Sequence, residues 1–524
     1  MKRMAVALLA TAMLSLAFAA TDAAGGAASA ISFSAAVAQV ASGRLGYLVP
    51  NAAAYVRAKA LAAGRAGQGI GQHQLGPHGT IDVAWDGVFD NSLSPPDPTG
   101  AIGPNSYVEL INAMYGIYTR TGTLISSGTL AQLTGASDAR VDPQILWDNN
   151  DQRFYYTVEN FANGDMAWGF SKDNNPRSAA DFCRYQGDFG YSGSTGTNFP
   201  DYPKLGNSRH LLLIGLNIFQ GFGGRFLGGD VAWIAKGSVG PNPISTCPPQ
   251  SRFLLGKFSN VKNADGSMIN APEPAVNTEP GLPTRPEGWM VGAPDVSSGA
   301  PKNYLTVYGF SPTPAGPRLS GPFTVPVASF NAPPNAPQCS STQVLDTLDG
   351  RLEHAVAAAD PLRGTTDAIW TAHAVAGGAG SQERWYEIDP TTNPPTLLQS
   401  GAATDSSLYV WNGGISPDRV VNRSGKAFGA SMSMGFNTSN SATCPAAQDV
   451  SKVDDNLQSG FVLVKQSAGP DGDFTCSPVC RWGDYSGATP DPAADLSGTE
   501  GDVWHSNMWI ASLNTRTENY EISP

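Results

Sequence analysis

Four acidic residues stand in similar sequence surroundings and could provide acid–base chemistry: Asp142, Asp201, Glu353 and Asp484. Each belongs to a short polar turn that opens an apolar stretch of strand length. Hydrolysis of a glycosidic bond needs two carboxyl groups about 5 to 10 Å apart, one as acid and one as base or nucleophile. Carboxylates from different repeats of one fold could meet that distance. The alternative is structural, because an acidic residue at a turn also accepts hydrogen bonds from backbone N–H groups.

Basic and aromatic residues accompany these turns. Arginines could bind the carboxylate of a sialic or uronic acid in bidentate fashion, or they could pair with a neighbouring aspartate instead. Tryptophan and tyrosine rings could stack on sugars. The residues expected to bind a substrate are Arg140, Lys204, Arg351, His354, Trp411, Arg481 and Tyr485.

Other chemistry has weaker support in the sequence. His354 could act as the base of an elimination reaction, although a histidine beside a strand is more often structural. Asp471-Gly472-Asp473 and Asp454-Asp455-Asn456 are oxygen-rich and could hold calcium. Neither has the spacing of an EF-hand, which favours solvated loops. Since no nucleophile elbow, P-loop or paired-histidine zinc motif is found, no cofactor is certain.

The turns recur along the chain and predict the architecture. The openings lie at 97, 142, 201, 273, 353, 411 and 483, with steps of 45, 59, 72, 80, 58 and 72 residues. A four-stranded propeller blade needs roughly 40 to 50 residues, and longer steps imply loop insertions. We therefore expect an all-β fold, a single seven-bladed β-propeller with little helix. Residues Ile81 to Trp85 could complete the blade that contains Trp509 to Leu513, which would close the ring.

The N-terminal region has a different composition. Residues 1–19 resemble a signal peptide, with Lys2-Arg3 before an apolar core and Ala17-Phe18-Ala19 as a cleavage site. Residues 20–79 are rich in Ala and Gly, which predicts a low-order spacer or pro-segment with a short helix over 51–63. The propeller is expected over 80–524. No later apolar run is long enough to span a membrane.

Charge and cysteine content agree with export. The net charge of −12 disfavours nucleic acid and anionic lipid as partners. The six cysteines form an even set, which after an export signal predicts disulfides. Cys476 and Cys480 could close a local loop, and Cys183 could pair with Cys247 across one blade.

Four motifs carry a resemblance to a known group. They are residues 94–107 (SPPDPTGAIGPNSY), 201–206 (DYPKLG), 384–388 (RWYEI) and 481–486 (RWGDYS). In this order they resemble a group of secreted bacterial β-propellers described as sialidase-like or BNR-repeat-like. The resemblance covers roughly residues 85 to 515 and implies the propeller fold.

These observations predict a secreted, monomeric protein that acts on an extracellular glycan, with the periplasm as the alternative location. The first expectation is a glycoside hydrolase that uses the four carboxylates. The alternatives are a non-catalytic, adhesin-like glycan-binding protein and a polysaccharide lyase. In each case the acidic and basic residues, together with Asp97 and Tyr202, should converge at one mouth of the central channel, because innermost strands run in the same direction.

Overall fold

The computed structural model describes residues 48–66, 75–161, 163–191, 198–237, 239–279, 286–421, 428–494 and 500–524. Strands make up 53% and helix 5%, so the all-β prediction is confirmed. The expected signal peptide lies outside the described residues. The described helices are α2 (Ala52–Ala63), α3 (Leu130–Thr134) and the short 3-10 turns η1 (Ala179–Asp181) and η2 (Gln250–Arg252). No helix in this described part is long and apolar enough to cross a membrane.

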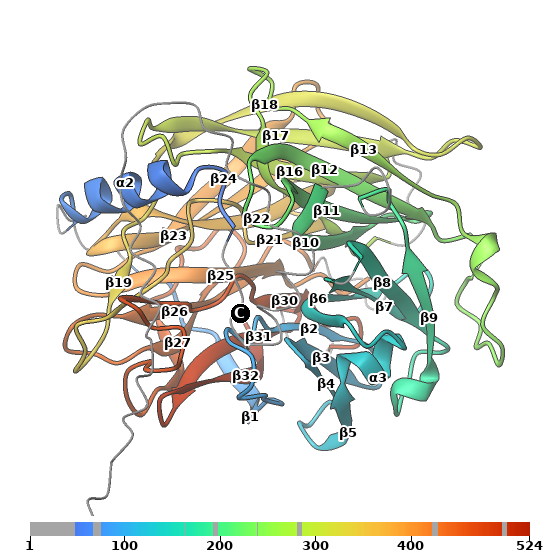
Figure 1. Cartoon of the computed structure of the whole chain (residues 1–524), viewed down its shortest axis with the longest axis horizontal. Coiled ribbons are helices and arrows are strands. Elements are labelled where there is room, and N and C mark those ends of the chain that lie inside the picture. The colour runs from blue at the N-terminus through green and yellow to red at the C-terminus, as the bar shows by residue number, and fades with distance from the viewer. Residues whose placement is uncertain are drawn as a thin grey trace, which may run out of the picture.

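Most described residues belong to sheets of four or five strands (Figure 1). The first three sheets are β2–β5 (Thr99–Ile102, Tyr107–Ile111, Met114–Tyr118, Leu124–Thr129), β6–β9 (Ala139–Asp148, Arg153–Asn160, Asp165–Ser171, Phe182–Gly187) and β10–β13 (Asn198–Asn207, Leu211–Gln220, Phe226–Ala235, Leu255–Val261). Within each, consecutive strands pair antiparallel.

The later sheets are less regular. The fourth is β14, β16, β17 and β18 (Ile269–Pro274, Gly288–Pro294, Lys302–Ser311, Arg318–Phe330), and the fifth is β15 and β21–β24 (Val276–Asn277, His354–Asp360, Thr365–Gly377, Gly380–Asp389, Thr396–Ala403). The sixth is β25–β28 (Tyr409–Pro417, Met432–Ser439, Ala446–Lys452, Val462–Gln466), and the last is β30, β31, β32 and β1 (Gly487–Pro490, Val503–Ala511, Asn514–Ser523, Thr80–Asp86). A small sheet joins β19, β20 and β29 (Ala336–Pro337, Val344–Leu345, Val479–Cys480).

The sheets form a closed ring. Their innermost strands contact one another in the order β2, β6, β10, β14, β21, β25 and β30, and β30 contacts β2 again. These strands surround the middle of the view in Figure 1. Strand β1 pairs with β32, so the N-terminal strand completes the last sheet as the sequence predicted. Ring closure leaves no exposed inner sheet edge.

A repeated backbone feature opens the inner strands. Five residues have left-handed φ angles between 49° and 61° at this place: Asp97, Asp142, Tyr202, Ala271 and Asn412. The pairing register of the last four shifts here, as in a β-bulge. Proline follows in every case except Asn412, which precedes glycine.

The bulge corrects two details of the predicted repeat. Tyr202, rather than Asp201, is the counterpart of Asp142. The fourth repeat opens at Ala271-Pro272, two residues before the expected Glu273-Pro274. The residue after the proline, such as Lys204 or Glu273, is therefore the one that lines the channel.

Three disulfides hold the loops. Cys183 is bonded to Cys247 and Cys476 to Cys480, which confirms both predicted pairs. A third bond joins Cys339 to Cys444 across 105 residues of sequence. Each native disulfide typically contributes about 2 to 4 kcal/mol by restricting the unfolded chain.

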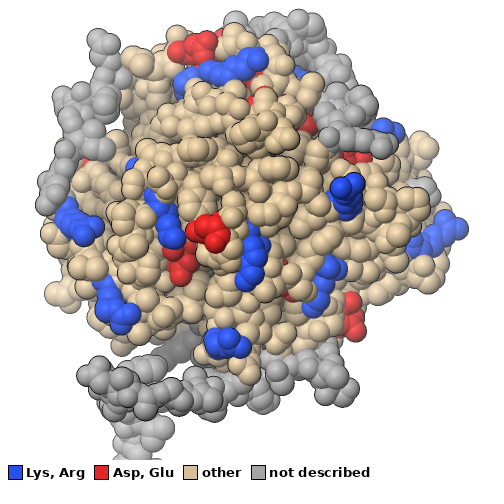
Figure 2. Space-filling view, turned by 90° about the horizontal axis from the view of Figure 1, so that it is seen from above, with Lys and Arg blue, Asp and Glu red and all other residues tan. Residues whose placement is uncertain are grey.

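The acidity of the chain lies largely inside. Among the described residues, 25 aspartates and glutamates are buried, against six lysines and arginines. The side of the molecule in Figure 2 shows charged side chains scattered among uncharged ones. The net charge of the sequence suggests an acidic surface. In the structure, buried carboxyl groups outnumber buried basic groups, so other groups must compensate the negative charge of the interior.

Candidate functional site

Three sheets meet at one mouth of the channel. Asp142 lies on β6, Asp201 on β10 and Asp484 in the turn before β30. The Tyr485 hydroxyl donates to Asp142 Oδ2 at 2.9 Å, and the Tyr202 hydroxyl donates to the Asp484 carbonyl at 2.8 Å. The two tyrosine rings stack with centroids 4.9 Å apart. Residues far apart in sequence thus form one connected group.

The arginines of this group are already engaged by aspartates. Arg351 Nε donates to Asp349 Oδ1 at 2.8 Å, and its guanidinium lies 4.4 Å from the centre of the Tyr202 ring. Arg481 donates to Asp484 Oδ2 at 2.6 Å. These contacts favour arginines that pair with neighbouring aspartates over arginines that bind the carboxylate of a substrate.

Asp346 and Asp97 belong to the same connected group. Arg481 Nη1 lies 3.6 Å from Asp346 Oδ2. Asp97 accepts from the Asp484 backbone N–H at 2.7 Å and from the Asn112 amide at 2.7 Å. Arg140 is half-buried on β6 and makes no side-chain bond to this group among the described residues.

Below the mouth, a second set of residues lines the narrow channel. Lys204 Nζ donates to the Glu353 carbonyl at 2.5 Å and lies 3.7 Å from Glu273 Oε2. The Glu353 carboxylate accepts backbone N–H bonds from Ala374 and Gly413. The channel cavity is about 20 Å³, which is room for about one water. No sugar ring fits beside these side chains.

His354 also lines this channel. Its Nδ1 lies 3.0 Å from the Ile415 carbonyl. Burial, with the charge of Lys204, lowers its pKa to about 4. His354 is half-buried, and the small cavity that it lines has no room for a polysaccharide.

Burial dominates the electrostatics of the mouth. Burial and neighbouring aspartates raise the pKa of Asp142 and of Asp201 to about 8. The pKa of Glu159, on β7, is raised well above its usual range by burial and by the charges of those two residues. Sequence reasoning missed Glu159, because it lies inside a strand, one residue before its end, and opens no turn.

The N-terminal segment lies over the mouth. Helix α2, the blue helix in Figure 1, donates from the Tyr55 hydroxyl to Asp346 Oδ1 at 2.5 Å and from Lys59 Nζ to Thr347 at 2.6 Å. The Leu48 carbonyl accepts from Arg351 at 3.3 Å. The sequence predicted a helix here, but its docking onto the arginine and aspartate group was not foreseen.

The expected sugar platforms are enclosed. Trp411 is 0% exposed and packs edge-on against Trp482 with centroids 5.5 Å apart. Tyr485 is 1% exposed, and Asp142, Asp201 and Asp484 are 9%, 8% and 6% exposed. The mouth therefore brings the predicted residues together but offers almost no surface to a large ligand.

A larger open space lies elsewhere, between the fifth and sixth sheets. This groove has a volume of about 880 Å³. Carboxamide side chains from several elements surround it, together with the buried ring of Trp385 and the half-buried ring of Phe461. The carboxamides are Gln382, Gln399, Gln448, Asn456 and Gln458.

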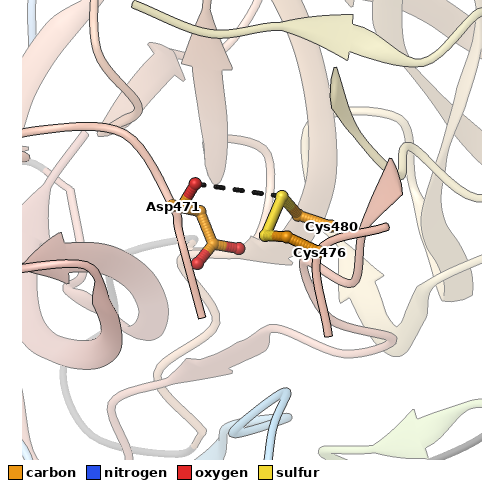
Figure 3. A group of neighbouring side chains, drawn as sticks. All are labelled: Asp471, Cys476 and Cys480. Atoms are coloured by element: carbon orange, nitrogen blue, oxygen red, sulfur yellow. Dashed lines mark hydrogen bonds between the residues drawn. A yellow bond between two sulfur atoms is a disulfide. The ribbon is translucent and has the colours of Figure 1, made fainter. Parts of the chain in front are cut away.

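Neither acidic loop named from the sequence gathers ligands for a metal. Asp471 lies beside Cys476 and Cys480, and Figure 3 shows the two sulfur atoms bonded to each other, so they are not free thiolates. Asp454 has a left-handed φ of 45°, and the largely exposed Asp455 pairs with Arg363 at 2.5 Å.

No protein-family model matches the chain, and no curated protein matches it. Among solved structures, the chain is similar to Trypanosoma rangeli sialidase, with 8% identity and a TM-score of 0.36 over 72% of this chain and 54% of that one. It is similar to phage phi92 endosialidase, with 6% identity and a TM-score of 0.38 over 72% and 66%. It is also similar to the α-L-arabinofuranosidase of Lactobacillus brevis, with 10% identity and a TM-score of 0.26 over 72% and 89%. The chain spans about half the length of the first sialidase.

Proposed function

We propose that this chain is a secreted, monomeric, seven-bladed β-propeller that binds an extracellular glycan in the groove between its fifth and sixth sheets. The observation that carries the proposal is that five carboxamides line a groove of about 880 Å³. A carboxamide both donates and accepts hydrogen bonds, which matches the hydroxyl groups of a neutral sugar. The volume falls in the range of ligand sites, roughly 300 to 1,000 Å³.

Three of the five carboxamides are held in place before any ligand arrives. Gln399 Nε2 donates to Glu387 at 2.7 Å, and Gln448 Nε2 donates to Thr438 at 2.7 Å. Gln458 accepts from Trp385 Nε1 at 2.7 Å and donates to the Ala402 carbonyl at 3.1 Å. Gln382 Oε1 is buried without a donor among the described residues. Fixed side chains reduce the entropy lost on binding.

Secretion and the blade count have separate support. Three disulfides are typical of an oxidising compartment. Seven sheets of four or five strands, with seven inner strands in one closed order, support seven blades.

A glycan array followed by calorimetry on its hits tests the proposal. The double variant Gln399→Ala/Gln448→Ala should weaken binding of a hit at least tenfold, because two anchored carboxamides are removed. The matched control is Gln250→Ala, an exposed carboxamide outside the groove. An array without hits, or equal affinity of the double variant and the control, would contradict the proposal.

Glycoside hydrolysis at the mouth is the second candidate function. It is favoured by the convergence of Asp142, Asp201 and Asp484 from three sheets, which could supply the acid and the base. Residues 48–63 would have to leave the mouth before a substrate could enter. Product analysis on array hits tests it: products formed by the natural protein and lost in Asp484→Asn would replace binding by hydrolysis as the function. Glu353, Lys204 and His354 belong to the channel, so a lyase based on His354 has no substrate-sized space.

A further inference from the structure

Three carboxyl side chains meet where the second and third sheets adjoin at the mouth. Asp142 on β6, Glu159 on β7 and Asp201 on β10 each offer an oxygen, and these oxygens all lie within 4.8 Å of one another. We call them the mouth cluster. Three like charges at this separation in a buried place repel one another strongly.

Glu159 distinguishes this cluster from an ordinary set of acidic residues. Its side chain is 0% exposed, and neither carboxylate oxygen has a hydrogen-bond donor among the described residues. Glu109 is equally buried but accepts bonds from the Val88 backbone, the Tyr118 hydroxyl and the Thr517 hydroxyl. A buried carboxylate without donors is strongly destabilising unless a bound ligand or a proton compensates its charge.

The cations nearby are committed to other carboxylates. Arg351 forms two bonds to Asp349, at 2.8 and 2.9 Å. Arg481 is paired with Asp484 and Asp346. Among the residues that the structure describes, the Tyr485 hydroxyl donates to Asp142 Oδ2 at 2.9 Å, and this bond fixes that carboxylate in place.

We propose that Asp142, Glu159 and Asp201 bind one divalent cation, and that the cation is Ca²⁺. All the donors are carboxylate oxygens, which suit hard cations rather than zinc or copper. Calcium–oxygen bonds of about 2.3 to 2.6 Å let one ion reach oxygens separated by up to about 5 Å. Magnesium keeps several waters, and the fully buried Glu159 leaves it little space for them.

The cation site does not depend on glycan binding in the groove. Its role would be to balance the charge of the mouth and hold β6, β7 and β10 together. The same ion would occupy Asp142 and Asp201, so calcium should suppress any hydrolysis that uses them. Calcium addition therefore also separates binding in the groove from hydrolysis at the mouth.

The experiment is calcium binding to the full chain after treatment with a chelator. Calorimetry with CaCl₂ should show one site, and the melting temperature should rise with calcium because the ion binds the folded state. Glu159→Gln keeps the shape of the side chain and should abolish both effects, and Asp201→Asn should weaken binding at least tenfold. Magnesium chloride should bind at least tenfold more weakly.

A matched control exists in the last sheet. Asp491, Asp502 and Glu521 also bring three carboxylate oxygens within 4.8 Å of one another, and we call them the last-sheet cluster. Glu521→Gln should leave calcium binding unchanged. The proposal is overturned if the natural protein shows neither heat nor stabilisation with calcium, or if Glu159→Gln folds, by circular dichroism, and still binds calcium fully. Equal affinity for magnesium would overturn the choice of ion.

Discussion

The mouth cluster and the last-sheet cluster each bring three carboxyl groups to the same separation, but their surroundings differ. In the last-sheet cluster, Arg120 Nη1 donates to Asp491 at 3.0 Å, and its other terminal nitrogen also bonds this carboxylate. Trp504 and Ser523 donate to Asp491 and Asp502 at 2.8 and 2.7 Å. The mouth cluster has the Tyr485 hydroxyl and no directly bonded cation among the described residues.

The difference follows from position. The side chain of Arg120 is 25% exposed, so a long side chain at the outer part of a sheet can reach its partner while keeping contact with water. Glu159 is 0% exposed and lies opposite Val141 in the pairing of β7 with β6. Arg120 balances the charge of the last-sheet cluster, whereas a small ion could balance the charge of the mouth cluster.

Removing Arg120 should have the largest effect on the free energy of unfolding. Arg120→Ala leaves Asp491 buried without its charge partner, which typically costs about 3 to 5 kcal/mol. It also removes the contact of the guanidinium with the Trp504 ring, at 5.6 Å. The free energy of unfolding in urea measures the loss.

The control for this variant is an exposed ion pair. Asp455→Ala breaks the pair between Arg363 and Asp455, whose side chain is 71% exposed, while Arg363 keeps its pair with Asp360, so the cost should be less than about 1 kcal/mol. If both substitutions have the same small cost, Arg120 does not balance the last-sheet cluster and the contrast between the clusters disappears.

The sequence predicts those parts of the molecule that depend on local chemistry. The turn residues at each repeat and the strand at Ile81–Trp85 indicate a closed ring, because turns and period-two strands are encoded by neighbouring residues. The bulge is less visible. Only its left-handed φ shows that Tyr202, and not Asp201, is the counterpart of Asp142.

The site was harder to predict than the ring. The convergence of Asp142, Asp201 and Asp484 follows from the repeat, but their burial, at 9%, 8% and 6% exposed, does not follow from it. Glu159 becomes a candidate ligand only beside Asp142 and Asp201, which lie on other strands. The carboxamides of the groove lie between residues 382 and 458 and share no sequence motif. Such long-range groupings need the three-dimensional arrangement.

Asp471 is a buried carboxyl that belongs to neither cluster. It shows how a buried acidic group behaves without an arginine partner and without two further carboxyls beside it among the described residues. Burial, reinforced by Asp473, raises the pKa of Asp471 to about 8. The unfolded chain gives up this proton near pH 4, while the folded protein keeps it up to about pH 8, so stability falls as pH rises between these values. Asp471→Asn should remove this fall and be more stable than the natural protein by more than about 1 kcal/mol at pH 8.

Thermal unfolding at pH 4, 6 and 8 measures this difference. Asp265→Asn is the control with the opposite sign. Hydrogen bonds from Ser267 and Tyr304 lower the pKa of Asp265 to about 2, so its replacement should not stabilise the protein at pH 8. A pH-independent effect of Asp471→Asn would mean that the carboxyl is ionised in the fold and balanced by another group.

The smallest effect concerns helix α2, which docks on Asp346 beside the mouth. Tyr55→Phe removes the 2.5 Å bond from helix α2 to Asp346 but keeps the ring, so the loss should be about 1 kcal/mol and local. Hydrogen exchange of the α2 amides should become about five- to tenfold faster, which is that free energy expressed as a rate. Tyr304→Phe loses a comparable bond to the exposed Asp265 and should leave α2 unchanged. Faster exchange that also spread to β31 and β32 would contradict a local effect and would show that α2 supports the whole ring.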